Sequence, residues 1–153
     1  MTAKAIDPKT LPVRSGSGYP APLNEAVKGR HKQALGEAFG LANFGVNLVR
    51  LEPGAWSSLR HWHEKQDELV YVLEGAITLV TDAGPQILKP GMVAGFAAGR
   101  PDGHHLINHT KADAWYLEVG DRNPGDVGHY SEADLKAVAQ PGWQFTRRDG
   151  SKV

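Results

Sequence analysis

The 153-residue chain contains no cysteine, and its 17 Lys and Arg residues are matched by 17 Asp and Glu residues. The missing thiols exclude a disulfide framework and a thiolate metal site, so any metal ion would need nitrogen and oxygen ligands. The zero net charge gives no basic footprint for nucleic acid. No apolar run approaches the length of a membrane span, and the first ten residues lack the apolar stretch of a signal peptide. We therefore expect no nucleic-acid partner, no membrane partner and a cytoplasmic location.

Short apolar runs separated by turn residues predict an all-β chain. The length is typical of one domain. We expect strands at residues 43–52, 57–63, 68–73, 76–81, 86–88, 92–96, 103–108 and 113–120. Many short strands with regularly spaced turns favour a sandwich or barrel over a parallel sheet.

The flanking segments are predicted to cover this β-rich core, which spans residues 43–120. Residues 1–42 are expected to form an N-terminal arm and an irregular segment that pack on the core, because their first part is rich in Pro, Gly and Ser. Residues 121–153 are expected to form a C-terminal extension with a short helix over 131–139. Ser131 can cap this helix, and the Pro-Gly pair that follows can end it.

The most informative pattern is a pair of histidines, His61 and His63, followed by Glu68 and then Gly75. Side chains two positions apart on a strand point to the same face, roughly 7 Å apart along it. Two imidazoles in this arrangement can converge on one ion, and a carboxylate arriving after a short turn can supply another ligand. The pattern therefore predicts a metal site at the start of the strand over 68–73.

A second histidine cluster follows a turn rich in Pro, Asp and Gly at residues 99–103. His104 would share one face of the next strand with Leu106 and Asn108, whereas His105 would point to the opposite face. Strand alternation thus favours His104 as a further ligand and leaves His105 as the alternative.

These two clusters resemble the two motifs of the cupin superfamily. The first motif is a glycine, His-x-His, a glutamate and a second glycine, and the second motif ends in a histidine followed by an asparagine. The matching residues are His61, His63, Glu68, Gly75, His104 and Asn108. The resemblance implies a single jelly-roll β-barrel and a divalent metal held by His61, His63, Glu68 and His104. This mixed ligand set suits Zn, Mn, Fe or Ni without choosing among them.

Three functions stay open at this point. The first is a metal-dependent enzyme of the oxygenase, decarboxylase or isomerase type. The second is a small-molecule-binding or sensing module without turnover. The third, which rests on analogy with the fold alone, is a sugar or sugar-phosphate isomerase or epimerase. An isomerase would need a free general base near the metal, and the sequence identifies no catalytic residue of this kind.

The expected partners are a small organic ligand and a second copy of the chain. The ligand would bear a carboxylate or be sugar-like, and Arg60, next to the ligand strand, is expected to hold an anionic group. A homodimer is expected because both faces of the strand over 68–73 are apolar, and small barrels often cover such a face with another subunit.

Overall fold

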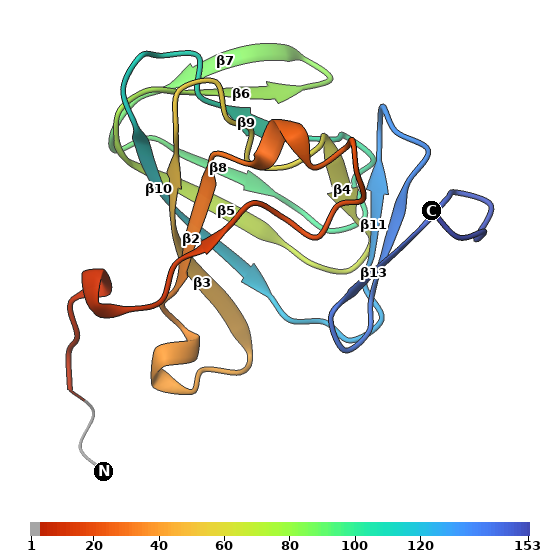
Figure 1. Ribbon diagram of the computed structural model, residues 1–153, viewed down its shortest axis with the longest axis horizontal. Coiled ribbons are helices and arrows are strands. Elements are labelled where there is room, and N and C mark those ends of the chain that lie inside the picture. Colours follow the sequence, from red (N-terminus) through yellow and green to blue (C-terminus); the bar gives the residue numbers. More distant parts are fainter. Residues whose placement is uncertain (1–3) are drawn as a thin grey trace.

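The computed structural model describes residues 4–153 and is built almost entirely of β-strands (Figure 1). The strands are β1 (Arg14–Ser15), β2 (Arg30–Ala34), β3 (Phe44–Leu51), β4 (His61–His63), β5 (Glu68–Glu74), β6 (Ile77–Thr81), β7 (Gly84–Leu88), β8 (Val93–Phe96), β9 (His105–Ile107), β10 (Ala114–Asp121), β11 (Val127–Tyr130), β12 (Lys136–Ala139) and β13 (Trp143–Thr146). Short 3₁₀ turns are η1 (Pro8–Thr10), η2 (Glu25–Val27) and η3 (Glu37–Phe39). The prediction of an all-β chain is confirmed. Within the described residues, no helix is long and apolar enough to cross a membrane.

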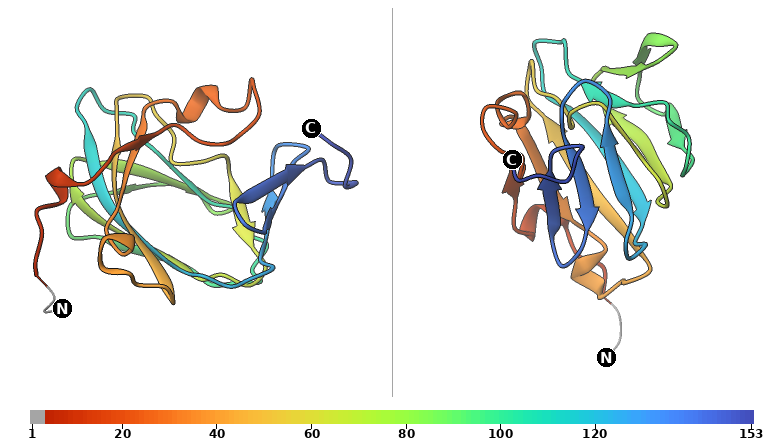
Figure 2. Two further views of the ribbon diagram at one scale, coloured as in Figure 1. Left: turned by 60° about the horizontal axis from the view of Figure 1, so that its bottom comes forward. Right: turned by 90° about the vertical axis from the view of Figure 1, so that its right-hand side faces the viewer.

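The strands form three antiparallel sheets. The largest has the order β1-β2-β3-β10-β5-β8, the second β13-β12-β11-β4, and the smallest β7-β6-β9. Figure 2 shows β12 and β13 at one end of the molecule beside β4, with η1 at the other end. Of the predicted arm and irregular segment, residues 1–3 lie outside the described range. The remainder contributes β1 and β2 to the largest sheet, because β2 pairs directly with β3.

The main core lies between the largest and the smallest sheet. Its side chains come from alternate positions of the strands, as expected where one sheet face packs on another. The buried set is Val49, Leu51, Ala55, Val70, Val72, Ile77, Leu79, Leu88, Leu106, Ala114 and Tyr116. This packing fixes the inner face of β5 and β10, which carries the polar groups described below.

A second, smaller core joins the N-terminal arm to the sheet that contains β4. Tyr19 of the arm packs edge-on against Tyr130 of β11, with ring centroids 5.6 Å apart, and against Phe145 of β13 at 5.4 Å. Val27 and Leu135 are almost fully buried in the same cluster. The arm thus closes one side of the region around β4.

The predicted closed barrel is wrong in detail, because the three sheets are not joined by hydrogen bonds into one cylinder. An isolated bridge between His61 of β4 and His104, the residue before β9, connects the second and smallest sheets, and a further bridge joins Trp56 of the loop before β4 to Ile107 of β9. At the other side, the edges β7 and β8 stay in different sheets, because the turn through Pro90 and Gly91 carries the chain from one wall to the other. The result is two facing walls rather than a continuous barrel.

The predicted C-terminal helix over 131–139 is also wrong. Residues 136–139 form β12, which pairs with both β11 and β13. Buried Leu135 and Ala137 alternate with more exposed neighbours, which is the two-residue period of a strand. Asp134, three residues after the proposed cap Ser131, instead accepts a hydrogen bond from the backbone N–H of Arg148. Pairing on both edges outweighs the local capping signal.

Gly75 occupies the turn between β5 and β6 for a steric reason. Its φ is +77°, and an added Cβ would lie 3.0 Å from the backbone oxygen of Asp113 and 3.0 Å from Cα of Ala114. Only glycine meets both demands without strain. The turn therefore lets β5 lie close to the start of β10.

Candidate metal centre

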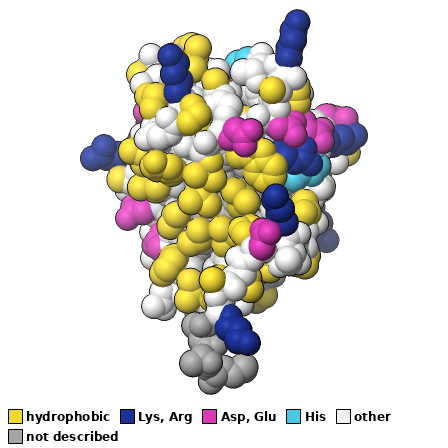
Figure 3. All heavy atoms as spheres, turned by 90° about the vertical axis from the view of Figure 1, so that its left-hand side faces the viewer, with side chains coloured by type: hydrophobic (Ala, Val, Ile, Leu, Met, Phe, Trp, Pro, Cys, Tyr) yellow, Lys and Arg dark blue, Asp and Glu magenta, His cyan; other side chains and the backbone are white. Residues whose placement is uncertain are grey.

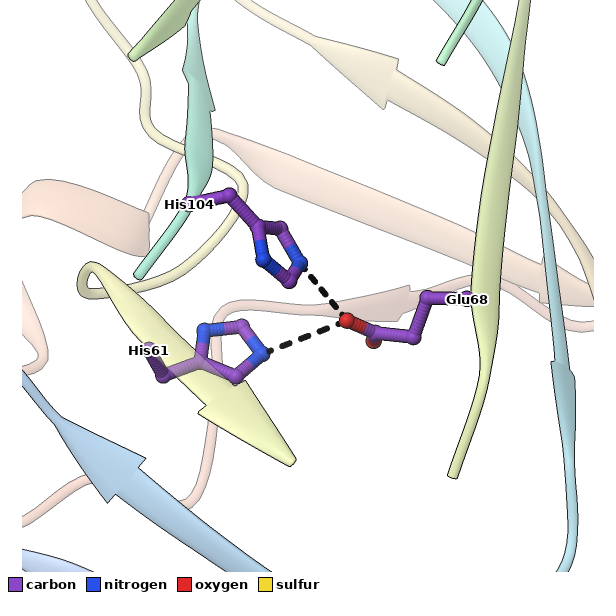
Figure 4. A group of neighbouring side chains, drawn as sticks. All are labelled: His61, Glu68 and His104. Atoms are coloured by element: carbon purple, nitrogen blue, oxygen red, sulfur yellow. Dashed lines mark hydrogen bonds and ion pairs between the residues drawn. The ribbon is translucent and has the colours of Figure 1, made fainter. Parts of the chain in front are cut away.

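His61, Glu68 and His104, three of the four predicted ligand residues, come together between the two walls of the molecule (Figure 4). His61 and His63 lie on β4, and Glu68 begins β5 on the opposite wall. Nε2 of His61 is 3.8 Å from Oε2 of Glu68, and Nε2 of His63 is 3.4 Å from Oε1. The two alternate histidines of this short strand therefore both lie near the carboxylate of Glu68.

His104 completes the group from the segment just before β9. Its Nε2 lies 2.6 Å from Oε2 of Glu68, and ligand atoms of His61, Glu68 and His104 all lie within 4.8 Å of one another. The backbone of His104 is bonded to that of His61 in both directions, which brings the two rings side by side. Three imidazoles thus surround one carboxylate.

His105 points elsewhere. It is buried, its Nδ1 lies 3.1 Å from the backbone oxygen of Ser58, and its ring packs edge-on against Trp56. Of the two neighbouring histidines, the structure brings His104 to Glu68. The next predicted motif residue, Asn108, is fully buried and donates to the backbone oxygens of Leu51 and Ala112. Asn108 therefore holds a turn rather than joining the histidine group.

Two of the three rings are held with Nε2 turned toward the carboxylate. Nδ1 of His61 is 2.8 Å from the backbone oxygen of Leu59, an atom that can only accept, so Nδ1 carries a proton. Nδ1 of His63 is 2.6 Å from Oδ2 of Asp126, which is fully buried. Such partners fix the tautomer of a histidine whose other nitrogen binds a metal.

His104 is positioned by packing instead. Its ring is stacked on Phe96 with centroids 3.5 Å apart and planes 1° apart. Its buried Nδ1 has no hydrogen-bond partner among the described residues. Stacking fixes the plane of this ring, and because an ionised carboxylate can only accept, the contact with Glu68 places a proton on Nε2 in the metal-free protein.

The charges of the group favour proton binding when no metal competes. Burial would raise the pKa of Glu68, but the hydrogen bond with His104 and the nearby rings of His61 and His63 outweigh it and hold the pKa well below its usual range. Burial would lower the pKa of His63, but the carboxylates of Glu68 and Asp126 raise it to about 9. Burial lowers the pKa of His104 despite the nearby Glu68. A proton on His63 thus accompanies the ionised Glu68.

A cavity of about 1030 Å³ opens from this group and is large enough for a small metabolite. Aromatic side chains form one part of its wall, from the arm, β11 and the C-terminal strands. Charged and polar side chains from the inner face of the largest sheet form another part. These two sets include Tyr19, Tyr130, Trp143 and Phe145, and Arg30, Lys32, Asn47, Tyr116 and Glu118.

The sequence interpretation missed the residues that support or face the histidine group. Asp126 lies 63 residues after His63 in the chain, in a loop with no motif, so no local signal identifies it. Lys32 and Glu118 form an ion pair in the cavity wall. An acidic residue at an inward position of an otherwise apolar strand was the available signal for Glu118. Arg60, expected to hold an anion, instead forms ion pairs with Asp82 and Glu132.

Comparisons with known proteins agree with this geometry. A family model described as the Cupin domain matches residues 47–120. A crystal structure from Silicibacter pomeroyi, described as a sugar phosphate isomerase from a cupin superfamily, is 49% identical with a TM-score of 0.94. That match covers 98% of this chain and 96% of the other. No curated protein sequence matches.

More distant structures share the architecture. A protein from Acidithiobacillus ferrooxidans, provisionally named a sugar phosphate isomerase, is 29% identical with a TM-score of 0.73, over 81% of this chain and 80% of that one. A polyketide cyclase from Streptomyces resistomycificus is 20% identical with a TM-score of 0.63, over 78% and 80% of the two chains. At that lower identity, the similarity shows the fold alone.

Proposed function

Because the chain belongs to the cupin superfamily, we propose that it is a metal-dependent isomerase of a small sugar phosphate. The carrying observation is the convergence of three imidazoles on Glu68 at the inner end of a large cavity. The proposed ligands are His61, His63, Glu68 and His104. The proposed metal is a divalent transition ion, with Zn, Mn, Fe and Ni all compatible with nitrogen and carboxylate donors.

The donor set fits such an ion. Nδ1 of His61 and of His63 is occupied by a backbone oxygen and a carboxylate respectively, so each Nε2 can present a lone pair to the centre. Glu68 is ionised and placed among the three rings. When bound, a divalent metal would supply Lewis-acid polarisation of a substrate carbonyl.

The cavity wall supports an anionic substrate. The guanidinium of Arg30 is held by the backbone oxygens of Ser57, at 2.5 Å, and Gly16, at 2.6 Å. Neutral carbonyl groups fix this side chain without cancelling its charge, and its buried Nε has no partner among the described residues. Arg30 is therefore a rigid positive group in the cavity, suited to a phosphate. The crystal structure that is 49% identical is described as a sugar phosphate isomerase, which supports the same substrate class.

The test begins with metal analysis of the purified protein. The metal-loaded protein is then incubated with glucose 6-phosphate, mannose 6-phosphate, ribose 5-phosphate and arabinose 5-phosphate, and products are followed by ³¹P and ¹H NMR. We expect interconversion of one aldose and ketose pair that stops with chelator and returns with one metal. Tight binding of a sugar phosphate without turnover would instead support the binding module.

We also propose that the chain forms a homodimer. The outward side chains of β5, Leu69, Tyr71 and Leu73, are 41–42% exposed, and Val93 on the neighbouring β8 is 57% exposed. Figure 3 shows hydrophobic side chains gathered over one face of the molecule, with charged side chains mostly at its edges. A second copy of the chain is a suitable partner, because in a two-fold dimer the same apolar patch on each subunit covers the patch on the other.

Sedimentation equilibrium tests the proposed dimer. Wild-type protein should sediment as a dimer, and Tyr71→Glu should sediment as a monomer that remains folded. A monomeric wild-type protein would refute the proposal. The cytoplasmic location expected from the sequence stays a prediction.

A further inference from the structure

A second carboxylate, that of Glu118, lies in the cavity on the same sheet face as Glu68. Glu118 of β10 pairs with Val70 of β5, whereas Glu68 pairs with Gly120 of β10. The two glutamates are therefore diagonal neighbours on adjacent strands, where backbone positions are about 7–8 Å apart. Gly120 has no side chain to separate them, and all three residues line the cavity. A small molecule beside Glu68 would thus also reach Glu118.

The partners of Glu118 leave part of its carboxylate available. Nζ of Lys32 and Nδ2 of Asn47, the latter at 2.9 Å, both donate to Oε1. Within residues 4–153, both hydrogen bonds to the Glu118 carboxylate thus reach the same oxygen, Oε1. The Glu118 side chain is 26% exposed. Oε2 is left for solvent or for a ligand in the cavity. The carboxylate is therefore anchored through one oxygen and open at the other.

The tightest group of possible ligand atoms contains His61, Glu68 and His104, and both His63 and Glu118 lie outside it. Nε2 of His63 is nevertheless 3.4 Å from Oε1 of Glu68, whereas Glu118 is bonded to Lys32 and Asn47. Its partners are the ammonium of Lys32 and the amide nitrogen of Asn47, and neither of these nitrogen atoms offers a lone pair to a metal in these states. An isomerase of this type needs a free base close to the centre, and a carboxylate is a suitable one. Glu68, surrounded by imidazoles, cannot serve in this way while it is a ligand.

We propose that Glu118 is a catalytic residue, the base that moves the carbon-bound proton of the substrate. The assignment rests on the proposed isomerase function and names a residue for it. The carboxylate takes the proton from the carbon that bears the hydroxyl group next to the carbonyl. That C–H bond breaks, its electron pair forms the C=C bond of an enediol, and the carbonyl electron pair moves to oxygen.

The second half of the step returns the proton. Glu118 gives it to the former carbonyl carbon, where the C=C electron pair forms the new C–H bond. The ammonium of Lys32, which is bonded to Glu118, donates a proton to the former carbonyl oxygen and regains one from the neighbouring hydroxyl as the new C=O bond forms. The hydrogen atoms and electrons of aldose and ketose balance, and no external oxidant or reductant is needed.

Solvent deuterium exchange tests the assignment. Metal-loaded wild type and Glu118→Gln are incubated in D₂O with the four sugar phosphates named above, and deuterium at the reacting carbons is followed by ¹H NMR. Wild type should incorporate deuterium. Glu118→Gln should retain its metal and remain folded, with a somewhat lower unfolding temperature because Lys32 loses its ion-pair partner, while exchange and turnover fall by at least about 100-fold, the usual contribution of a general base.

The matched control is Glu25→Gln. Glu25 also forms an ion pair with a lysine, Lys28, at 2.6 Å, but its side chain is 61% exposed and does not line the cavity. Its replacement should leave exchange unchanged. Glu118→Ala supplies a further readout, because formate can enter the space left by the side chain and restore exchange. A purely structural role would show no such rescue.

The outcomes separate the two proposals. Full exchange by Glu118→Gln, or wild-type turnover without deuterium incorporation, would overturn the role of Glu118 and leave the isomerase function standing. Loss of metal from Glu118→Gln together with absence of formate rescue would also overturn it. If Glu118→Gln does not fold, Glu118→Asp keeps the charge and should slow exchange with the metal retained; an unchanged rate would overturn the assignment. Inactive wild type with all four sugar phosphates would remove both proposals.

Discussion

Glu68 and Glu118 are carboxylates on the same inner sheet face, yet their surroundings differ. Glu68 is approached by ring nitrogens of His61, His63 and His104, whereas Glu118 is bonded to Lys32 and Asn47. A neutral imidazole presents a ring lone pair to a metal, whereas the ammonium of Lys32 and the amide nitrogen of Asn47 present only N–H groups to Glu118. The difference teaches that the neighbours of a half-buried carboxylate, more than its position, decide whether it can belong to a metal centre.

The largest effect is expected when imidazoles are removed from around Glu68. Replacing His61 and His63 together by Ala should lower metal affinity by more than about 100-fold, because loss of supporting contacts alone costs up to that amount. Metal content measured after dialysis, with circular dichroism for folding, checks this. Glu118→Gln should keep its metal under the same conditions. Stoichiometric metal in the folded double variant would refute the proposed ligand set.

A change of pH should alter both the stability and the metal affinity of the histidine group over a defined pH range. In the metal-free protein the pKa of His63 is raised from 6.5 to about 9. The bound proton therefore adds about 3 kcal/mol to the free energy of unfolding below pH 6.5, and this is lost as the pH rises through about 9. Metal affinity should rise over the same window, because the metal must displace that proton. Denaturant unfolding and metal titration measure the two trends, and a pH-independent affinity would contradict them.

A smaller effect is expected from the support of one ring. Asp126→Asn removes the charge that faces Nδ1 of His63 while keeping the size of the side chain. Metal affinity should fall by about 10- to 100-fold. The pH range over which metal affinity rises should also end at a lower pH, because Asp126 contributes to the raised pKa of His63. Competition with a chelator measures the affinity, and an unchanged value would show that Asp126 does not orient the ring.

The smallest effect is expected from a change next to Glu118. Asn47→Ala removes one of the two donors to Glu118 and should lower the free energy of unfolding by about 1 kcal/mol. Its metal content should equal that of wild type. Thermal unfolding and metal analysis check both statements. Loss of metal from this variant would show that the two carboxylates are not independent.

Local pattern predicted much of this molecule. The strand over residues 68–73 is found as β5, and the alternation that paired His61 with His63 and separated His104 from His105 is found in the side-chain directions. Each of these features depends on a period of two residues, which the sequence states directly.

The errors concern features set by distant contacts. The capping pattern at Ser131 predicted a helix, but pairing of β12 with two neighbouring strands formed a sheet instead. Asp126 and Lys32 lie 63 and 86 residues from the groups they bond, and no local signal encodes such a pairing. The predicted closed barrel also depended on distant contacts. It would need hydrogen bonds between the edge strands of different sheets, and the sequence does not state which edges pair.

The backbone bridge between His61 and His104 joins two sheets that otherwise form separate ladders, and Glu68 belongs to the wall opposite them. An ion bound by these three residues would link all three sheets at one point. Its binding free energy would then add to the stability of the entire domain rather than to that of a single loop. Amide protons far apart in the chain should consequently exchange more slowly together when the ion is present.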